Sequence, residues 1–522
     1  MRRVQAFVLL LLAACLTLAA VKRPDLSAIS AIRPEEIRKH IDFLAADSLL
    51  GRDTPSPQLD LAADYIRTQF KEDGLLPLGE QYFQTFKLNL VHLGEENYVK
   101  LAQPGKPTLS LKIKREFMPF EFTADGEAEG KLVFAGYGVT APEYGYDDYA
   151  DVDVKGKIVL VLKHEPGEKD PESPFAGEKP TTHSSVRAKF DNAVAHGAAG
   201  LLVVTDPLNH RSLRPRGFPW PSLFRNIPDD ALPYTLVLSE KTRIPVVQVG
   251  KHFLRAVFGS VDSVKAIQQQ IDSSLTPHSF VIADARVSLR TSTRVESART
   301  QNVVAYLEGS DPKLRDEAIV IGAHYDHVGY VHGPRKPGED YIYNGADDNA
   351  SGTVGLLEVA KAFSLARVRP RRSVIFIAFA GEEKGLFGSR YYVENPLWPL
   401  AKTRAMLNMD MIGRNEGDRV TIIGHTWSPT LKQINEEENR YVGMQLDYNG
   451  EQFFRRSDQY SFARKGVPVL MYHTGEHPDY HKVSDNPDKI KEGKIAMIAR
   501  LVFRTAWHAA NTDQVFETKK VN

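Results

Sequence analysis

Residues 318–326 read AIVIGAHYD, an apolar run typical of a buried strand that ends in a histidine and an aspartate. A helical pattern follows at Thr353–Leu365, and a second apolar run, SVIFIA, occupies residues 373–378. Near-continuous apolar strands that alternate with helices indicate a sheet buried on both faces. This stretch therefore predicts an α/β fold. Three more apolar strands extend the pattern, at residues 404–409, 420–423 and 467–471.

Polar residues collect where the predicted strands end, in five separate segments of the chain. The segments are GAHYDH at 322–327, NGADDNASG at 344–352, FAGEE at 379–383, NMDM at 408–411, and YHT at 472–474 with DYH at 479–481. In α/β sheets, ligands bind beyond the carboxyl ends of the strands. We therefore expect the histidines and carboxylates of these segments to converge at one rim of the sheet.

The residue types in this set point to a metal site. Clustered carboxylates raise one another's pKa unless a cation compensates their charge. Imidazole nitrogen and carboxylate oxygen, without sulfur, suit zinc in a hydrolytic site. A pair of ions about 3.5–4 Å apart needs several terminal ligands and one bridging carboxylate, and this set supplies them.

Each segment also has an ordinary structural interpretation. A histidine near an aspartate is often structural, Glu-Glu before Lys resembles a solvated helix start, and Asp-Asp-Asn in a glycine-rich stretch resembles a turn. The occurrence of all five segments in order, each at a predicted strand end, favours the metal site. Four other histidines could reach the rim, but we interpret them as structural or surface residues: His327, His425, His473 and His477.

The first residues differ from the rest of the chain. Arg2 and Arg3 precede an apolar run that continues to about Val21. This run is short for a membrane span, which needs roughly 20 apolar residues, and residues 1–22 fit a secretory signal peptide. We prefer ordinary cleavage, while lipoprotein processing with a lipid on Cys15 and an uncleaved anchor stay open. We therefore expect export to the periplasm or beyond, with no stable membrane span after processing.

The segment before the catalytic region contains further predicted elements. Amphipathic helices are predicted at residues 34–46 and 59–70. Short apolar strands and helices between residues 131 and 258 indicate a compact mixed α/β unit. No catalytic cluster is evident in that unit.

Charge and cysteine content exclude several functions. Lys+Arg and Asp+Glu are equal at 66 each over 522 residues. No global basic field therefore recruits nucleic acid, and no acidic bias points to a basic partner. Cys15 is the only cysteine, so ordinary cleavage leaves no disulfide, cysteine nucleophile or thiolate ligand. The oligomeric state does not follow from the sequence.

The five segments also carry a family resemblance. The chain resembles the M28 family of zinc peptidases in GAHYD at 322–326, GADDNASG at 345–352, FAGEE at 379–383, NMD at 408–410 and DYH at 479–481. The resemblance implies a zinc-exopeptidase fold, with a mixed, mostly parallel sheet flanked by helices. It also implies three modules: N-terminal elements at 30–128, an inserted protease-associated (PA) domain at 129–290 and the peptidase domain at 299–512.

The resemblance further implies roles for individual residues. His324 and Asp410 hold one zinc, Glu383 and His481 hold the other, and Asp348 bridges both. Two zinc ions per chain are thus the implied cofactor. The implied substrates are peptides with a free N-terminus, which makes the chain an exported di-zinc aminopeptidase.

Other residues are assigned to the reaction itself. The resemblance implies that Glu382 is the general base, which takes a proton from water and passes it to the leaving amine. The resemblance also implies that Asp326 contacts His324 without binding the metal and so orients the imidazole ring. The peptide bond Asp348-Asn349 is implied to be cis, and Tyr480 to lie near the oxyanion.

Three other functions stay open. A carboxypeptidase of the same family usually adds a long helical C-terminal domain, whereas about forty residues follow His481 here. A glutaminyl cyclase uses one zinc and lacks the full ligand set. A non-catalytic binding protein on this scaffold would lose ligands that this sequence keeps. The PA domain either shapes access to the cleft, docks partners, or packs passively.

Overall fold

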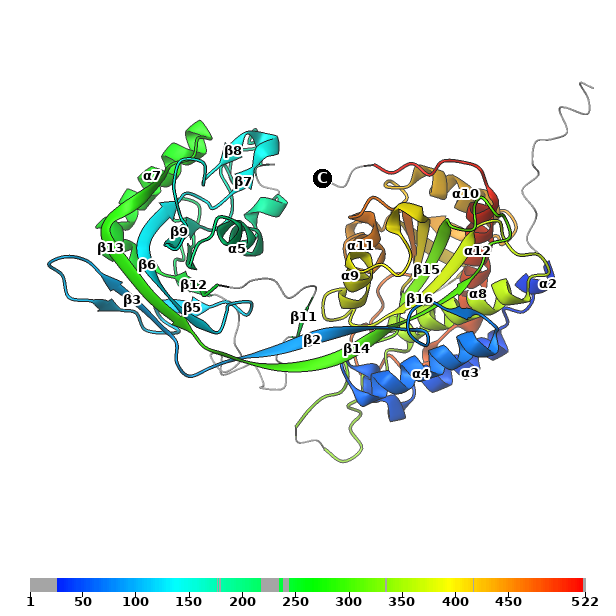
Figure 1. Cartoon of the computed structure of the whole chain (residues 1–522). Coiled ribbons are helices and arrows are strands. Elements are labelled where there is room, and N and C mark those ends of the chain that lie inside the picture. The colour runs from blue at the N-terminus through cyan, green and yellow to red at the C-terminus, as the bar shows by residue number, and fades with distance from the viewer. Residues whose placement is uncertain are drawn as a thin grey trace, which may run out of the picture. The chain divides into compact units, whose positions relative to one another are not determined.

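The computed structural model describes residues 26–175, 177, 180–216, 234–237, 244–333, 336–415 and 417–519. The predicted signal peptide at 1–22, with Cys15, lies outside these residues. The chain divides into two compact units, Met1–Leu88 with Ala298–Asn522, and Asn89–Ser297. It passes from one unit to the other in β2 (Phe83–Leu93) and back in β14 (Thr293–Leu307) (Figure 1). The module boundaries at 30–128, 129–290 and 299–512 stay predictions.

The first unit is built on a mixed, mostly parallel sheet, as the sequence predicts. From β14, the strand order is β16 (Ser373–Phe379), β15 (Ala318–His324), β17 (Thr403–Met409), β20 (Val469–His473), β18 (Arg419–Ile423) and β19 (Gln445–Asp447). Strands β16, β15, β17 and β20 are parallel, while β14 and β18 pair antiparallel to β16 and β20. The short β1 (Leu76–Pro77) pairs antiparallel with β14. The predicted catalytic segments therefore follow neighbouring parallel strands.

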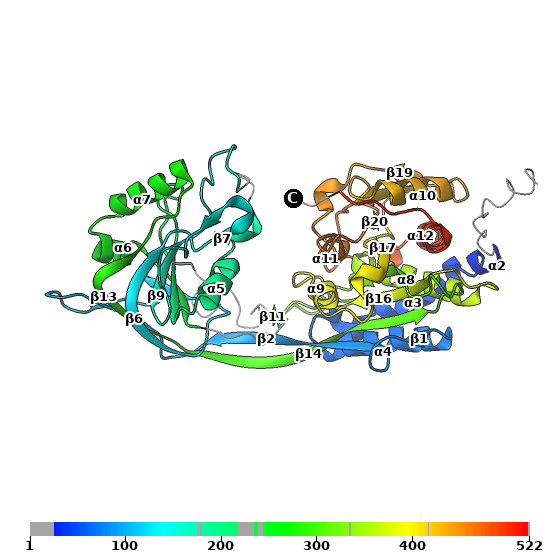
Figure 2. The same ribbon diagram turned by 45° about the horizontal axis from the view of Figure 1, so that its top comes forward.

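Helices cover both faces of this sheet (Figures 1 and 2). One layer contains α3 (Pro34–Leu44), α4 (Pro57–Glu72), α8 (Gly352–Leu365) and α12 (Glu492–Asn511), with α10 (Pro429–Asn439) against α12 and the short α2 (Leu26–Ile29) against α8. The other layer contains α9 (Phe387–Glu394) and α11 (Gln459–Ala463). This covering explains why the central strands are apolar at successive positions.

Two successive residues of β16 show the two-sided burial. Ile375 packs in one hydrophobic cluster with Phe462 of α11. The next residue, Phe376, has its ring centroid 5.8 Å from that of Phe363 on α8. All of these side chains are buried, so both faces of the strand contribute apolar surface to the core.

The second unit has its own sheet and helices. The strand order is β4 (Leu109–Ser110), β3 (Tyr98–Ala102), β13 (Ser279–Thr291), β6 (Gly126–Ala135), β9 (Ile158–Leu162), β10 (Gly200–Val204), β12 (Val246–Val249) and β5 (Phe117–Pro119). Strands β6, β9, β10 and β12 are parallel. One hydrophobic cluster includes α5 (Val186–Ala195), and the other includes α6 (Lys251–Phe258) and α7 (Val261–Ser274). The predicted compact α/β unit is therefore confirmed.

The structure differs from the sequence prediction mainly at element ends and in the long strands. Helix α4 begins at Pro57 rather than residue 59, because the Ser56 hydroxyl accepts a hydrogen bond from the Leu59 N–H at 3.0 Å and caps the helix. Strands β13 and β14 were not predicted, because many of their residues are exposed or half-buried and break the apolar pattern. Within the described part of the chain, no helix combines the length and apolar character needed to cross a bilayer.

Two leucines of α4 test the packing of its apolar stripe. Leu59 is fully buried, whereas Leu61 is 55% exposed. We expect Leu59→Ala to lower the free energy of unfolding by about 2–5 kcal/mol. Leu61→Ala, the matched control, should change it by less than about 0.5 kcal/mol. Urea denaturation followed by circular dichroism measures both values, and equal losses would contradict this packing.

Candidate metal centre

The glycine-rich loop at 345–352 is fixed against the end of β17 by Asn349. The Asn349 Oδ1 accepts hydrogen bonds from the Gly352 N–H at 2.9 Å and the Met411 N–H at 3.1 Å, and its Nδ2 donates to the Met409 carbonyl at 3.0 Å. A Cβ at Gly352 would lie 2.4 Å from that carbonyl, so this close approach requires glycine. The Asp348-Asn349 bond is cis, as the resemblance implies. The loop thereby holds Asp348 beside the strand ends.

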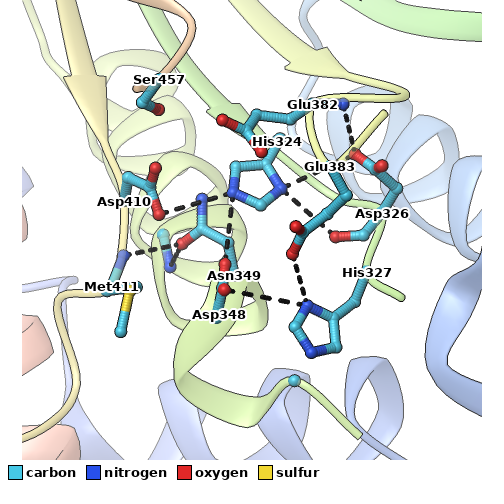
Figure 3. Close-up of polar contacts among 12 residues, drawn as sticks. His324, Asp326, His327, Asp348, Asn349, Glu382, Glu383, Asp410, Met411 and Ser457 are labelled. Carbon is cyan, nitrogen blue, oxygen red and sulfur yellow. Dashed lines mark hydrogen bonds and ion pairs between the residues drawn. The ribbon is translucent and has the colours of Figure 1, made fainter. Parts of the chain in front are cut away.

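The predicted metal ligands come together in two groups that share Asp348. Figure 3 shows His324, Asp348, Glu383 and Asp410 of these ligands side by side. In the first group, the Nε2 atom of His324 lies 3.4 Å from Oδ1 of Asp348 and 3.4 Å from Oδ1 of Asp410. In the second group, the Nε2 atom of His481 lies 3.0 Å from Oδ2 of Asp348 and 3.2 Å from Oε2 of Glu383. Each oxygen of Asp348 therefore faces a different group.

His327 also belongs to the second group, although the sequence interpretation made it structural. Its Nδ1 lies 2.8 Å from Oε1 of Glu383 and 3.9 Å from Oδ2 of Asp348. The side chain is buried. Its place three residues after His324, on the same strand-end loop, was the only signal in the sequence, and it did not distinguish a ligand from a packing residue.

Burial and ion pairing shift the pKa values of the central groups in opposite directions. Burial raises the pKa of Asp348, but hydrogen bonds from His324 and His481 hold this pKa well below its usual range. Burial lowers the pKa of His324, while the charges of Asp410 and Glu382 move this pKa well above its ordinary value. The protein thus gathers charged donors that a divalent cation would compensate. Imidazole and carboxylate donors without sulfur fit such an ion.

Glu382 and Asp326 stand beside the ligands and belong to neither group. Oδ1 of Asp326 accepts a hydrogen bond from the Glu382 N–H at 3.1 Å and lies 3.6 Å from Nδ1 of His324. The main-chain oxygen of Asp326 is closer to that nitrogen, at 3.2 Å. Burial raises the pKa of Glu382 well above its ordinary value; the positive charge of His324 lowers this pKa, and the negative charge of Glu383 raises it further. Asp326 therefore contacts both the predicted base and the first ligand.

A cavity of about 50 Å³ opens against these residues. Its lining residues are Asp348, Glu382, Glu383, Asp410, Met411, Phe453, Arg456, Met471, His473, Glu476 and Tyr480. The Tyr480 ring stacks on His481 with centroids 4.0 Å apart. The lining thus combines several carboxylates with the apolar side chains of Met411, Phe453 and Met471.

The remaining candidate histidines have other partners. The Nδ1 atom of His473 lies 2.8 Å from the main-chain oxygen of Asp410. His477 lies 3.2 Å from Oδ2 of Asp347. His425 lies 2.7 Å from Oε1 of Glu451. His473 and His425 thus have polar partners, whereas the buried Nε2 of His477 makes no hydrogen bond with a described residue and its Nδ1 accepts one from the Asp479 N–H at 3.3 Å.

Arg52 is a buried cation that the sequence reasoning missed, because the loop before α4 showed no apolar period or chemical motif. Its guanidinium donates hydrogen bonds to the main-chain oxygens of Tyr325 at 2.9 Å, Asn344 at 2.7 Å, Gly345 at 3.0 Å, and Leu44. Burial lowers its pKa to about 10. Arg52 therefore ties the loop after β15 to the loop that carries Asp348.

Two parts of the chain match known protein families. Residues 302–506 match the model of peptidase family M28, and residues 128–255 match the model of the PA domain. Residues 302–506 thus belong to peptidase family M28, and residues 128–255 form a PA domain. The M28 match therefore contains the candidate metal centre, and the PA match lies in the second unit.

Several characterised or solved proteins are similar to this chain. Aminopeptidase YwaD of Bacillus subtilis is 24% identical over 75% of this chain and 72% of its own length. A probable zinc metalloprotease of Leptosphaeria maculans is 39% identical over 33% of this chain and 46% of its own length. Leucine aminopeptidase 2 of Arthroderma otae is 27% identical over 43% of this chain and 48% of its own length. The matches to the last two proteins span less than half of their lengths.

A solved structure also matches over most of its length. The aminopeptidase from Aneurinibacillus sp. strain AM-1 is 21% identical, with a TM-score of 0.48, over 95% of this chain and 98% of that one.

Replacing Arg52 tests its link between the two loops. Arg52→Met removes the donor from buried carbonyls, and each unpaired buried acceptor costs about 1–3 kcal/mol. We expect the free energy of unfolding to fall by at least about 3 kcal/mol. Arg33→Met, which removes an exposed arginine paired with Glu36 at 3.3 Å, should change it by less than about 1 kcal/mol. An Arg52→Met protein as stable as the wild type would contradict the assigned contacts.

Proposed function

We propose that the chain is an exported aminopeptidase that uses two zinc ions to hydrolyse the N-terminal peptide bond. The observation that carries this proposal is the position of Asp348: its two carboxylate oxygens face two separate groups of ligand atoms. A single shared carboxylate between two donor sets is what a pair of ions about 3.5–4 Å apart requires. The names of the similar aminopeptidases and of the zinc metalloprotease support the activity and the metal.

The ligand assignment follows the two groups. His324 and Asp410 would hold one ion, Glu383 and His481 the other, and Asp348 both. Zinc bound there would lower the pKa of water and polarise the scissile carbonyl. His327, hydrogen-bonded to Glu383, would orient that carboxylate.

Glu382 is the proposed general base. Its side chain faces the cavity without belonging to either ligand group. Its raised pKa suits a group that takes a proton from water and then holds it for the leaving amine. Asp326, which accepts the Glu382 N–H, would fix the base relative to His324.

The cavity is suited to a substrate with a free α-amino group. The carboxylates that line it give a negatively charged surface for an ammonium group. Met411, Phe453 and Met471 would contact the first side chain, which favours apolar residues at the N-terminus. Tyr480 lies at the same cavity and could donate a hydrogen bond to the developing oxyanion.

The proposal includes export from the cytoplasm and excludes two alternative functions. Removal of residues 1–22 would release the protein outside the cytoplasm, and a lipid on Cys15 would retain it in the envelope. A carboxypeptidase would need a cationic group to bind the substrate carboxylate. The cavity, however, is lined mainly by acidic and apolar residues. Its one arginine, Arg456, pairs with Glu476 at 3.2 Å. A non-catalytic protein would have no need of Glu382 beside a complete ligand set.

Substitution of the proposed base tests the mechanism. We expect Glu382→Ala to retain zinc but to lose turnover by at least about 100-fold, because general base catalysis contributes roughly 10²–10⁴-fold. Metal analysis and steady-state hydrolysis measure the two effects separately. Glu394→Ala, which removes an exposed carboxylate of α9 paired with Lys465, should leave both unchanged. Near-wild-type turnover in Glu382→Ala would refute the base assignment.

The substrate class is tested with aminoacyl p-nitroanilides. Free aminoacyl substrates should release p-nitroaniline, apolar ones fastest, and a chelator should stop the reaction. N-acetylated substrates should react at least about 100-fold more slowly, because they lack the ammonium group that the carboxylates bind. Hydrolysis confined to blocked N-termini, or to C-terminal residues, would exclude an aminopeptidase.

A further inference from the structure

A second cluster of metal-type side chains lies in the second unit. It contains two histidines and two carboxylates: His164, Glu168, Asp206 and His210. Their four ligand atoms all lie within 4.8 Å of one another. The proposed peptidase mechanism uses none of them.

The parallel sheet brings these residues together. Strands β9 and β10 are parallel neighbours, with Leu162 paired to Val204. His164 and Asp206 each follow two residues after this pair, at the carboxyl ends of the strands, where α/β sheets bind ligands. A second donor follows four residues later in each segment, Glu168 after His164 and His210 after Asp206.

Each carboxylate of the cluster faces both imidazoles. Asp206 lies 2.5 Å from Nδ1 of His164 through Oδ1 and 3.6 Å from Nε2 of His210 through Oδ2. Oε2 of Glu168 lies 2.9 Å from Nε2 of His210 and 3.9 Å from Nδ1 of His164. The two imidazole rings stack with centroids 4.3 Å apart. Two protonated rings at this separation would repel, whereas neutral rings that share one cation would not.

The cluster is held in place by surrounding groups. Asp206 is fully buried, and its Oδ2 also lies 3.4 Å from Nε2 of Gln268. His164 has a φ of 62°, a conformation that non-glycine residues rarely adopt. Buried Lys189 donates hydrogen bonds to the main-chain oxygens of His164 and Tyr137. Such support is what a ligand set needs to keep its geometry.

We propose that His164, Glu168, Asp206 and His210 form a structural or regulatory binding site for one divalent transition-metal ion, with zinc as the best match. Two imidazoles and two carboxylates supply four donors and two negative charges, which suits tetrahedral zinc. The ion ties the segment after β9 to the segment after β10. This site is separate from the di-zinc proposal, because its ligands are different residues.

A cavity opens beside His164 and His210 of the cluster. It has a volume of about 220 Å³, and its lining residues are Lys163, His164, Thr205, His210, Arg211, Ser212, Arg214, Arg216 and Gln248. The basic side chains of this lining oppose the approach of a dication, so Glu168 and Asp206, which do not line the cavity, must supply the attraction. The side chains of His164 and His210 are 25% and 32% exposed, which leaves both within reach of solvent.

The test is the metal content of the whole protein, measured by mass spectrometry after dialysis against limiting zinc. His210→Ala and Glu168→Gln are each compared with their parent protein, in the wild-type chain and in Asp348→Ala, which removes the shared ligand of the catalytic unit. His252→Ala is the matched control, an exposed histidine of the same unit that pairs with Glu116 at 2.8 Å. Circular dichroism establishes that each variant is folded.

We expect His210→Ala and Glu168→Gln each to lower bound zinc by one ion per chain in both backgrounds, and His252→Ala to lower none. Cobalt bound to Asp348→Ala should give the visible absorption of a four-coordinate site, and His210→Ala should remove it. Folded variants with the metal content of their parents would overturn the proposal and leave an ion-paired cluster. The zinc lost through Asp348→Ala reports on the catalytic unit alone, so the two proposals can fail independently.

Discussion

The buried carboxylate of Asp348 is the constraint on which the rest of the site depends. It stands between His324 and His481 and within a few ångströms of other anions, in a place that water scarcely reaches. Several negative charges gathered out of water destabilise a fold unless cations and hydrogen bonds compensate them. The protein supplies two histidines and the buried Arg52, and two divalent ions would complete the compensation. The same ions would provide the proposed chemistry.

The fold meets this constraint through parts that are distant in the sequence. Parallel β15, β16, β17 and β20 end at one rim and place the ligand segments side by side. Asn349 attaches the loop that carries Asp348 to the end of β17, and Arg52 joins that loop to the turn after β15. The apolar core on both faces of the sheet supplies the rigidity. The hydrogen-bonded loops and the apolar core therefore keep the polar side chains of the site in fixed positions.

Much of this arrangement could be predicted from the sequence, since apolar strands and the residues at their ends are local patterns. The rule about strand ends predicted that the segments would converge, and the family resemblance selected His324, Asp348, Glu383, Asp410 and His481 within them. His327 and Arg52 were missed because their roles depend on contacts with residues far along the chain. The cluster in the second unit was missed for the same reason: it exists only through the register between β9 and β10. Strands β13 and β14 were missed because their exposed residues give no apolar run.

The central claim is that the two oxygens of Asp348 belong to two different metal ions. Anomalous X-ray scattering at the zinc absorption edge, from crystals of the zinc-loaded protein, tests it most directly. The account predicts two peaks in the catalytic unit, one within about 2.0–2.2 Å of Oδ1 and the other at the same distance from Oδ2. One peak bound by both oxygens, or no peak beside Asp348, would contradict it.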